Sequence, residues 1–173
     1  SKKRGEMIIP EAMAYFNQAL PFVSDTSTYL AELAGNTLIS AYQYDRAIAL
    51  YEQRVAFDPR NYIDQYKLSR AYQLAGKGSA VWSKAFEKTI TLIQRELQLR
   101  PQNALAAAYL GLALSRYGRY PEGEANGKRA LRLAPDDLTI KYKLANIYSI
   151  QKKKNEAIDA LAQAIKTRYM LEE

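Results

Sequence analysis

Three prolines in this chain stand in the same short sequence context and set a period. The segments 58–61 (DPRN), 100–103 (RPQN) and 134–137 (APDD) each place Asn or Asp two residues after the proline. Proline cannot continue a helix, and Asn or Asp caps the first turn of the next one. The interval from Pro101 to Pro135 has the length of a small helical repeat, so it predicts stacked copies of one unit.

Other apolar and small residues keep the same spacing as the prolines. Each copy has a Leu or Ala followed by a small residue, and a Leu or Tyr three positions after that. A second apolar stretch follows, so each copy is predicted to contain two amphipathic helices. The first group of markers comprises Ala34, Gly35 and Leu38, then Leu68, Ser69 and Tyr72, then Leu110, Gly111 and Leu114, and finally Leu144, Ala145 and Tyr148.

This pattern resembles the tetratricopeptide repeat (TPR), and the resemblance extends over about residues 28–168. It implies an all-α fold, a right-handed α-solenoid of stacked helix-turn-helix repeats. We expect about nine helices and no strands. The predicted division is a basic tail with an N-terminal capping helix at 1–27, followed by repeats at 28–61, 62–103, 104–137 and 138–173.

The expected helices follow from the caps and breakers. We place them near residues 11–20, 27–40, 45–57 with Asp45 as the cap, 61–75, 79–99, 103–117, 121–133, 137–150 and 155–168. The second repeat is longer than the others, and we assign the excess to the helix at 79–99. Gly123 and Gly127 within the helix at 121–133 cost about 1 kcal/mol each against alanine. We attribute them to close backbone packing against the next repeat.

The helix at 79–99 is apolar over a wide arc, with Trp82, Phe86, Ile90, Ile93 and Leu97 at helical spacing. We interpret this arc as packing against both neighbouring repeats. The alternative is that its protruding end around Trp82 is a contact surface for another domain or a second copy.

The chain contains neither Cys nor His. Disulfides, thiolate nucleophiles, imidazole bases and the usual zinc ligands are therefore excluded. The segment Gly76–Ser79 lacks the first glycine and the preceding strand of a phosphate-binding loop. We predict no catalytic residue, no metal and no cofactor, and therefore no enzymatic activity.

The TPR resemblance implies a groove lined by the first helix of each pair, suited to an extended or helical peptide. Tyrosine offers a rigid apolar face with a polar tip, asparagine can bond a peptide backbone, and arginine or lysine can hold carboxylates. The predicted groove residues are Tyr29, Asn36, Tyr66, Arg70, Tyr109, Arg116, Tyr142, Lys143 and Asn146. A protein or peptide is thus the expected partner.

Two further hypotheses remain open. The net charge of +7 is concentrated in the second half and includes Lys152, Lys153 and Lys154. This half could attract nucleic acid or an acidic partner, although no nucleic-acid motif accompanies it. The other hypothesis is self-association as a homodimer, through the Trp82 helix or through the last helix pair, which leaves Ile158 and nearby apolar residues uncovered.

The arrangement of the repeats is also similar to C-terminal arrays of bacterial signalling proteins, where a kinase, cyclase or DNA-binding module precedes them. We interpret the chain as a piece of a longer signalling or regulatory protein. No apolar run is long enough to cross a bilayer, and no signal peptide is visible. We expect a cytoplasmic location, although the absence of Cys indicates no compartment.

Overall fold

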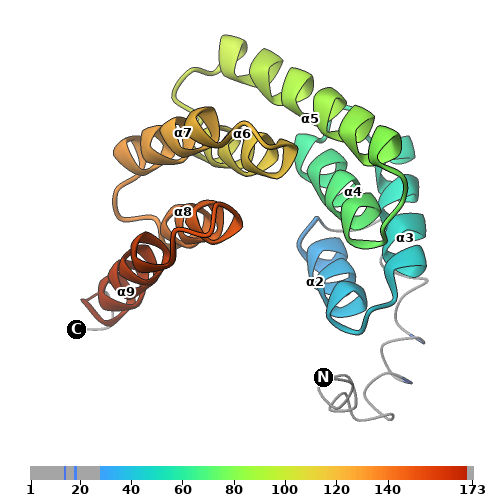
Figure 1. The fold of residues 1–173 in the computed structure, drawn as a ribbon, viewed down its shortest axis with the longest axis horizontal. Coiled ribbons are helices and arrows are strands. Elements are labelled where there is room, and N and C mark those ends of the chain that lie inside the picture. Colours follow the sequence, from blue (N-terminus) through green and yellow to red (C-terminus); the bar gives the residue numbers. More distant parts are fainter. Residues whose placement is uncertain (1–13, 15–17, 19–27, 171–173) are drawn as a thin grey trace. The chain divides into compact units, whose positions relative to one another are not determined.

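The computed structural model describes residues 14, 18 and 28–170, and this part of the chain is helical without strands (Figure 1). The all-α prediction is confirmed, whereas the helix expected at 11–20 falls largely outside the described residues. The eight helices are α2 (Thr28–Ser40), α3 (Tyr44–Phe57), α4 (Tyr62–Leu74), α5 (Ser79–Leu99), α6 (Ala104–Tyr117), α7 (Tyr120–Leu133), α8 (Leu138–Ile150) and α9 (Lys154–Met170).

The residues two positions after the prolines cap the helices that follow. The Asn61 side chain accepts hydrogen bonds from the backbone amides of Ile63 and Asp64, at 3.0 and 3.2 Å. Asn103 accepts one from the amide of Ala106 at 3.0 Å. Asp137 caps α8 in the same way. These three helix starts are confirmed, because each side-chain oxygen satisfies amides that have no partner within the helix.

The prediction that Asp45 caps α3 is wrong. The helix begins at Tyr44, and Gln43 occupies the capping position without a side-chain hydrogen bond to the backbone. Tyr42 has a positive φ of 59°, which turns the chain before that point. The Asp45 carboxylate instead accepts a hydrogen bond from Lys77 Nζ at 2.9 Å.

The chain divides into two compact units, Ser1–Ala85 and Phe86–Glu173. The boundary falls inside α5, the long helix that the sequence places in the second repeat. In the first unit α3 packs against both α2 and α4. Its core includes Leu38, Tyr51 and Leu68. A Cβ at Gly35 would lie only 2.0 Å from the Tyr51 hydroxyl, so glycine is needed beneath this ring.

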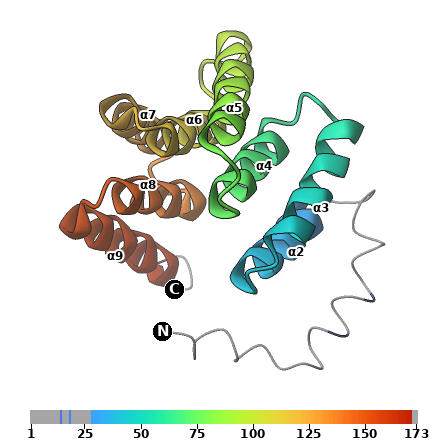
Figure 2. The same cartoon turned by 45° about the vertical axis from the view of Figure 1, so that its right-hand side comes forward.

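In the second unit α6 packs on α7, α8 packs on α9, and α8 also contacts both α6 and α7 (Figure 2). Gly111 of α6 faces Gly123 and Gly127 of α7. A Cβ at Gly111 would lie 2.7 Å from the Gly123 carbonyl oxygen and 2.7 Å from Ile147 Cδ1. The glycines of α7 therefore permit close backbone packing against α6 of the same repeat, and not against the backbone of the next repeat as predicted. The next repeat contributes the Ile147 side chain, which packs α8 against the pair.

One face of the α5 helix is buried, and this face includes Phe86, Ile90 and Ile93. Trp82 is partly buried. The Tyr117 hydroxyl of α6 donates a hydrogen bond to the Glu87 carboxylate at 2.5 Å. None of the described helices combines the length and the apolar character that a bilayer span requires.

Candidate functional site

The predicted groove residues lie on the first helix of each pair, in α2, α4, α6 and α8. Each unit carries its own share of them. The first unit contains Asn36, Tyr66 and Arg70, together with Tyr29, whose side chain lies outside the described part. The second contains Tyr109, Arg116, Tyr142, Lys143 and Asn146.

A group of charged side chains, buried except for Glu32, underlies the face of the first unit. Arg54 of α3 donates to Asp64 Oδ2 of α4 from Nε at 3.1 Å and from Nη2 at 3.0 Å. Lys67 of α4 donates from Nζ to Glu32 Oε1 of α2 at 2.5 Å. Burial raises the pKa of Asp64 although Arg54 opposes it, and burial lowers the pKa of Lys67 although Glu32 opposes it. Removal from water is thus the largest cause in both cases.

Arg70 is a third cation beside this group. Its charge lowers the pKa of the Tyr51 hydroxyl and of the Lys67 amine, against the larger effect of burial on Tyr51. The Arg70 Nε atom is buried and has no hydrogen-bond partner in the described part of the chain. The carboxylates near these three cations are Glu32 and Asp64, together with Asp58, whose charge raises the pKa of Asp64. The donor of Arg70 suits a ligand carboxylate, because guanidinium and carboxylate form strong charge-assisted hydrogen bonds.

The other two described residues of this face differ in exposure. Asn36 is partly exposed, so its amide remains accessible. Tyr66 is only 4% exposed, and its ring is therefore part of the packed interior. The repeat register placed Tyr66 on the correct helix but did not show how closely neighbouring helices cover it.

Three of the predicted residues in the second unit lie against other side chains or are largely enclosed. The Lys143 ammonium of α8 lies 4.2 Å from the centroid of the Tyr109 ring of α6, a cation–π contact. Tyr109 is 2% exposed, and Lys143 is also buried. Arg116 is partly buried. The contact between Lys143 and Tyr109 contributes to the packing of α8 on α6.

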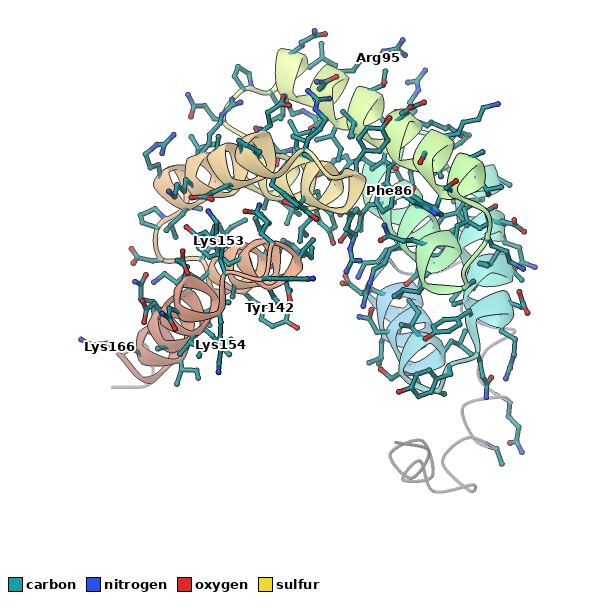
Figure 3. All side chains as sticks on the ribbon, in the orientation of Figure 1. Phe86, Arg95, Tyr142, Lys153, Lys154 and Lys166 are labelled. Carbon is teal, nitrogen blue, oxygen red and sulfur yellow. The ribbon has the colours of Figure 1, made fainter. Side chains whose placement is uncertain are left out.

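Tyr142 and Asn146 instead line a cavity of about 540 Å³ formed by α8 and α9. Tyr142 is 55% exposed and projects from α8 on the same side as Lys154, whereas Lys153 lies on the side of α7 (Figure 3). Tyrosine, asparagine, lysine and aliphatic groups thus surround one hollow. The other lining residues are Ala145, Ser149, Lys152, Lys154, Ala157, Ile158 and Leu161.

The groove prediction considered only the first helix of each pair, so it did not include the α9 residues of this cavity. The self-association hypothesis had instead named this apolar surface, with Ile158, Leu161 and Ile165 at helical spacing. They are 54%, 42% and 53% exposed. Among the described residues, no three potential metal ligands cluster together.

The fold is similar to that of TTC0263, a thermophilic TPR protein of Thermus thermophilus, with a TM-score of 0.61 and 22% identity over 91% of this chain and 82% of that one. MamA from Desulfovibrio magneticus RS-1 gives a TM-score of 0.47, with 15% identity over 95% and 88% of the two chains. No protein-family model and no curated protein matches the sequence. The similarity to TTC0263 confirms the predicted TPR fold.

Proposed function

We propose that this chain is a non-enzymatic protein-interaction module that binds a peptide segment of a partner protein on the faces of its first helices. The observation that carries the proposal is Arg70, a partly exposed side chain beside two ion pairs, whose buried Nε has no hydrogen-bond partner among the residues that the structure describes. A buried donor without a partner costs free energy that a ligand acceptor can recover. The ligand best suited to it carries a carboxylate.

The surroundings of Arg70 favour a peptide over a small anion. Asn36, on the neighbouring first helix of the same unit, is partly exposed and can bond a peptide backbone. In the repeat register its position in α2 corresponds to that of Arg70 in α4. Corresponding positions on stacked first helices form a row, which an extended segment can follow. The similarity to C-terminal arrays of signalling proteins supports a place in a larger signalling or regulatory protein.

An immobilised peptide library tests this proposal. Each peptide is presented twice, once with free carboxylates and once with its C-terminus amidated and Asp and Glu replaced by Asn and Gln. We expect the labelled protein to prefer the carboxylate forms. Arg70→Gln should weaken that binding roughly tenfold or more, the equivalent of one charge-assisted hydrogen bond.

Arg60→Gln is the matched control, because Arg60 is an exposed arginine in the turn before α4. It removes the same charge and should leave binding unchanged. Tyr66→Ala is a poor probe, since Tyr66 is buried and its loss would test the core instead. Equal binding of both peptide forms, or full retention by a folded Arg70→Gln variant, would reject the proposal.

The basic second half provides no comparable argument for nucleic-acid binding. Arg119 pairs with Glu122, and both Lys128 and Lys153 pair with Glu124. Arg129 donates to the Pro101 carbonyl oxygen at 2.6 Å. Two carboxylates thus partly neutralise three of these cations and a carbonyl oxygen orients a fourth, and we propose no second function there.

A further inference from the structure

The cavity between α8 and α9 corresponds to the surface on which α8 itself rests. Ile147 of α8 lies against Gly111 and Gly127, as the close approach of its Cδ1 to both glycines shows. One repeat further along the chain, Ala145 stands at the position of Gly111 and Leu161 at that of Gly127. Both of these line the cavity. The last helix pair, α8 and α9, therefore presents a packing surface for one more helix. It corresponds to the surface that α6 and α7 present to α8.

The α2 helix presents a face that could pack on this surface of α8 and α9. With the longer second repeat taken into account, Ile140 and Ile147 of α8 correspond to Leu30 and Thr37 of α2. By the same register, Lys143 corresponds to Leu33. In α8 these positions are buried against the preceding pair. In α2 the two leucines are 43% and 55% exposed.

The side-chain volumes of the two surfaces are complementary. Where α8 rests on α6 and α7, a large Ile147 meets glycines. In the cavity the glycines are replaced by the larger Ala145 and Leu161. On α2 the residue at the Ile147 position is the smaller Thr37. The smaller Thr37 would thus face the larger Ala145 and Leu161, which preserves the close packing that such contacts require.

The charges also agree with this docking. The end of α8 lies at the turn between α6 and α7, where Gln151 Nε2 donates to Ser115 Oγ at 3.0 Å and to the Tyr120 carbonyl at 3.1 Å. A helix seated in the same way in the cavity would end beside Lys152 and Lys154. The C-terminal end of a helix carries partial negative charge, which cations stabilise. The last turn of α2 contains no basic residue that would repel these lysines.

We propose that α2 of one copy of this chain docks into the cavity between α8 and α9 of a second copy. The contact is head to tail, with different surfaces on the two partners, so it can propagate into a chain or close into a ring. It uses residues other than Arg70 and stands or falls independently of the proposed peptide binding.

Two variants of the full chain test the contact from its two sides. Leu33→Asp alters α2 and Leu161→Asp alters the cavity, and each should raise the dissociation constant for self-association roughly tenfold or more. The mass distribution is measured by analytical ultracentrifugation over a dilution series. Leu99→Asp is the matched control, because Leu99 is 80% exposed at the end of α5 and should leave association unchanged.

Mixing the two variants gives the decisive result. The Leu33→Asp chain keeps its cavity and the Leu161→Asp chain keeps its α2, so an equimolar mixture should form a dimer and nothing larger. Circular dichroism verifies that both fold, and Leu33→Ser and Leu161→Ser replace them if helicity is lost. A wild-type chain that stays monomeric at every concentration overturns the proposal. So does unchanged association of Leu33→Asp, which would assign the cavity to another α9 or to a foreign helix.

Discussion

The paired helices of the two units are held together by different kinds of contact. In the second unit α6 and α7 meet at Gly111, Gly123 and Gly127, where backbone approaches backbone. Within the described part of the first unit, only Gly35 has a comparable role, beneath the ring of Tyr51. A buried ion pair, Arg54–Asp64, and a half-buried one, Lys67–Glu32, join α4 to its neighbours there.

This difference determines which changes each unit tolerates. A contact made by close backbones is limited by volume, because any added atom must displace a neighbour. A contact made by buried charges is limited by pairing, because removing one partner leaves the other unsatisfied in a poorly solvating interior. The same repeat fold thus allows two sources of stability, and they respond to different substitutions.

The largest effect is expected at the buried pair of the first unit. Asp64→Ala leaves the Arg54 guanidinium buried without its carboxylate, and Arg54 and Asp64 are 6% and 2% exposed. We expect a loss of about 3–5 kcal/mol in the free energy of unfolding. Urea unfolding followed by the fluorescence of Trp82, the single tryptophan and a residue of the first unit, measures it.

The control for this prediction removes both charges together. Replacing Arg54 with Met and Asp64 with Leu leaves no unpaired group, and such replacements are commonly neutral or stabilising. If the double variant is as unstable as Asp64→Ala, side-chain volume limits this contact, and the contrast between the units disappears.

A smaller effect is expected at the glycines of the second unit. Gly111→Ala should cost about 1–3 kcal/mol, because its Cβ would lie 2.7 Å from the Gly123 carbonyl oxygen and backbone cannot easily move aside. Gly127→Ala is the matched control. The atoms nearest to its Cβ would be side-chain atoms, with the methyl ends of Ile147 and Leu144 at 2.7 and 2.9 Å.

Both substitutions gain the same helix propensity, about 1 kcal/mol for alanine over glycine. Because the Ile147 and Leu144 side chains must shift but can do so more easily than backbone, Gly127→Ala should destabilise less than Gly111→Ala. Thermal unfolding followed by far-UV circular dichroism compares them directly. Equal midpoints for the two variants would mean that backbone approach does not control this contact.

The repeat register and the helix starts could be predicted because they depend on local chemistry. Proline followed by Asn or Asp defines a helix start whatever surrounds it, as Asn61 and Asn103 show. The prediction for Asp45 was wrong because Tyr42 adopts a positive φ and the helix begins at Tyr44, before Asp45. Lys77, which binds its carboxylate, lies 32 residues away along the chain.

The faces of the helices could be predicted, but the contacts made on them could not. Helical spacing placed Tyr109 and Lys143 on first helices, yet their mutual contact spans two repeats and leaves Tyr109 without an exposed ring. Arg70 and Lys67 look equivalent in sequence, and only the structure shows that Glu32 pairs with Lys67. Whether a side chain is available to a ligand depends on such neighbours, which the spacing of apolar residues does not encode.

The smallest effect concerns surface charge and compares the units once more. Glu124 of α7 binds Lys128 at 2.7 Å and also binds Lys153, and hydrogen bonds from these lysines lower its pKa. A lowered folded-state pKa stabilises the protein above the ordinary pKa of a glutamate, and this stability is lost as the pH falls through the lowered value. Glu124→Gln should therefore cost about 1 kcal/mol or less at neutral pH and nothing in acid.

Because both lysines are substantially exposed, added salt should shrink the effect of Glu124→Gln at neutral pH. Glu32→Gln in the first unit should retain more of its effect in salt, since Lys67 is buried there. Urea unfolding at low and high salt separates the two, with Asp159→Asn as an exposed control on α9. Equal salt sensitivity at Glu32 and Glu124 would show that burial does not protect the pair in the first unit, and charge would then contribute to the two units in the same way.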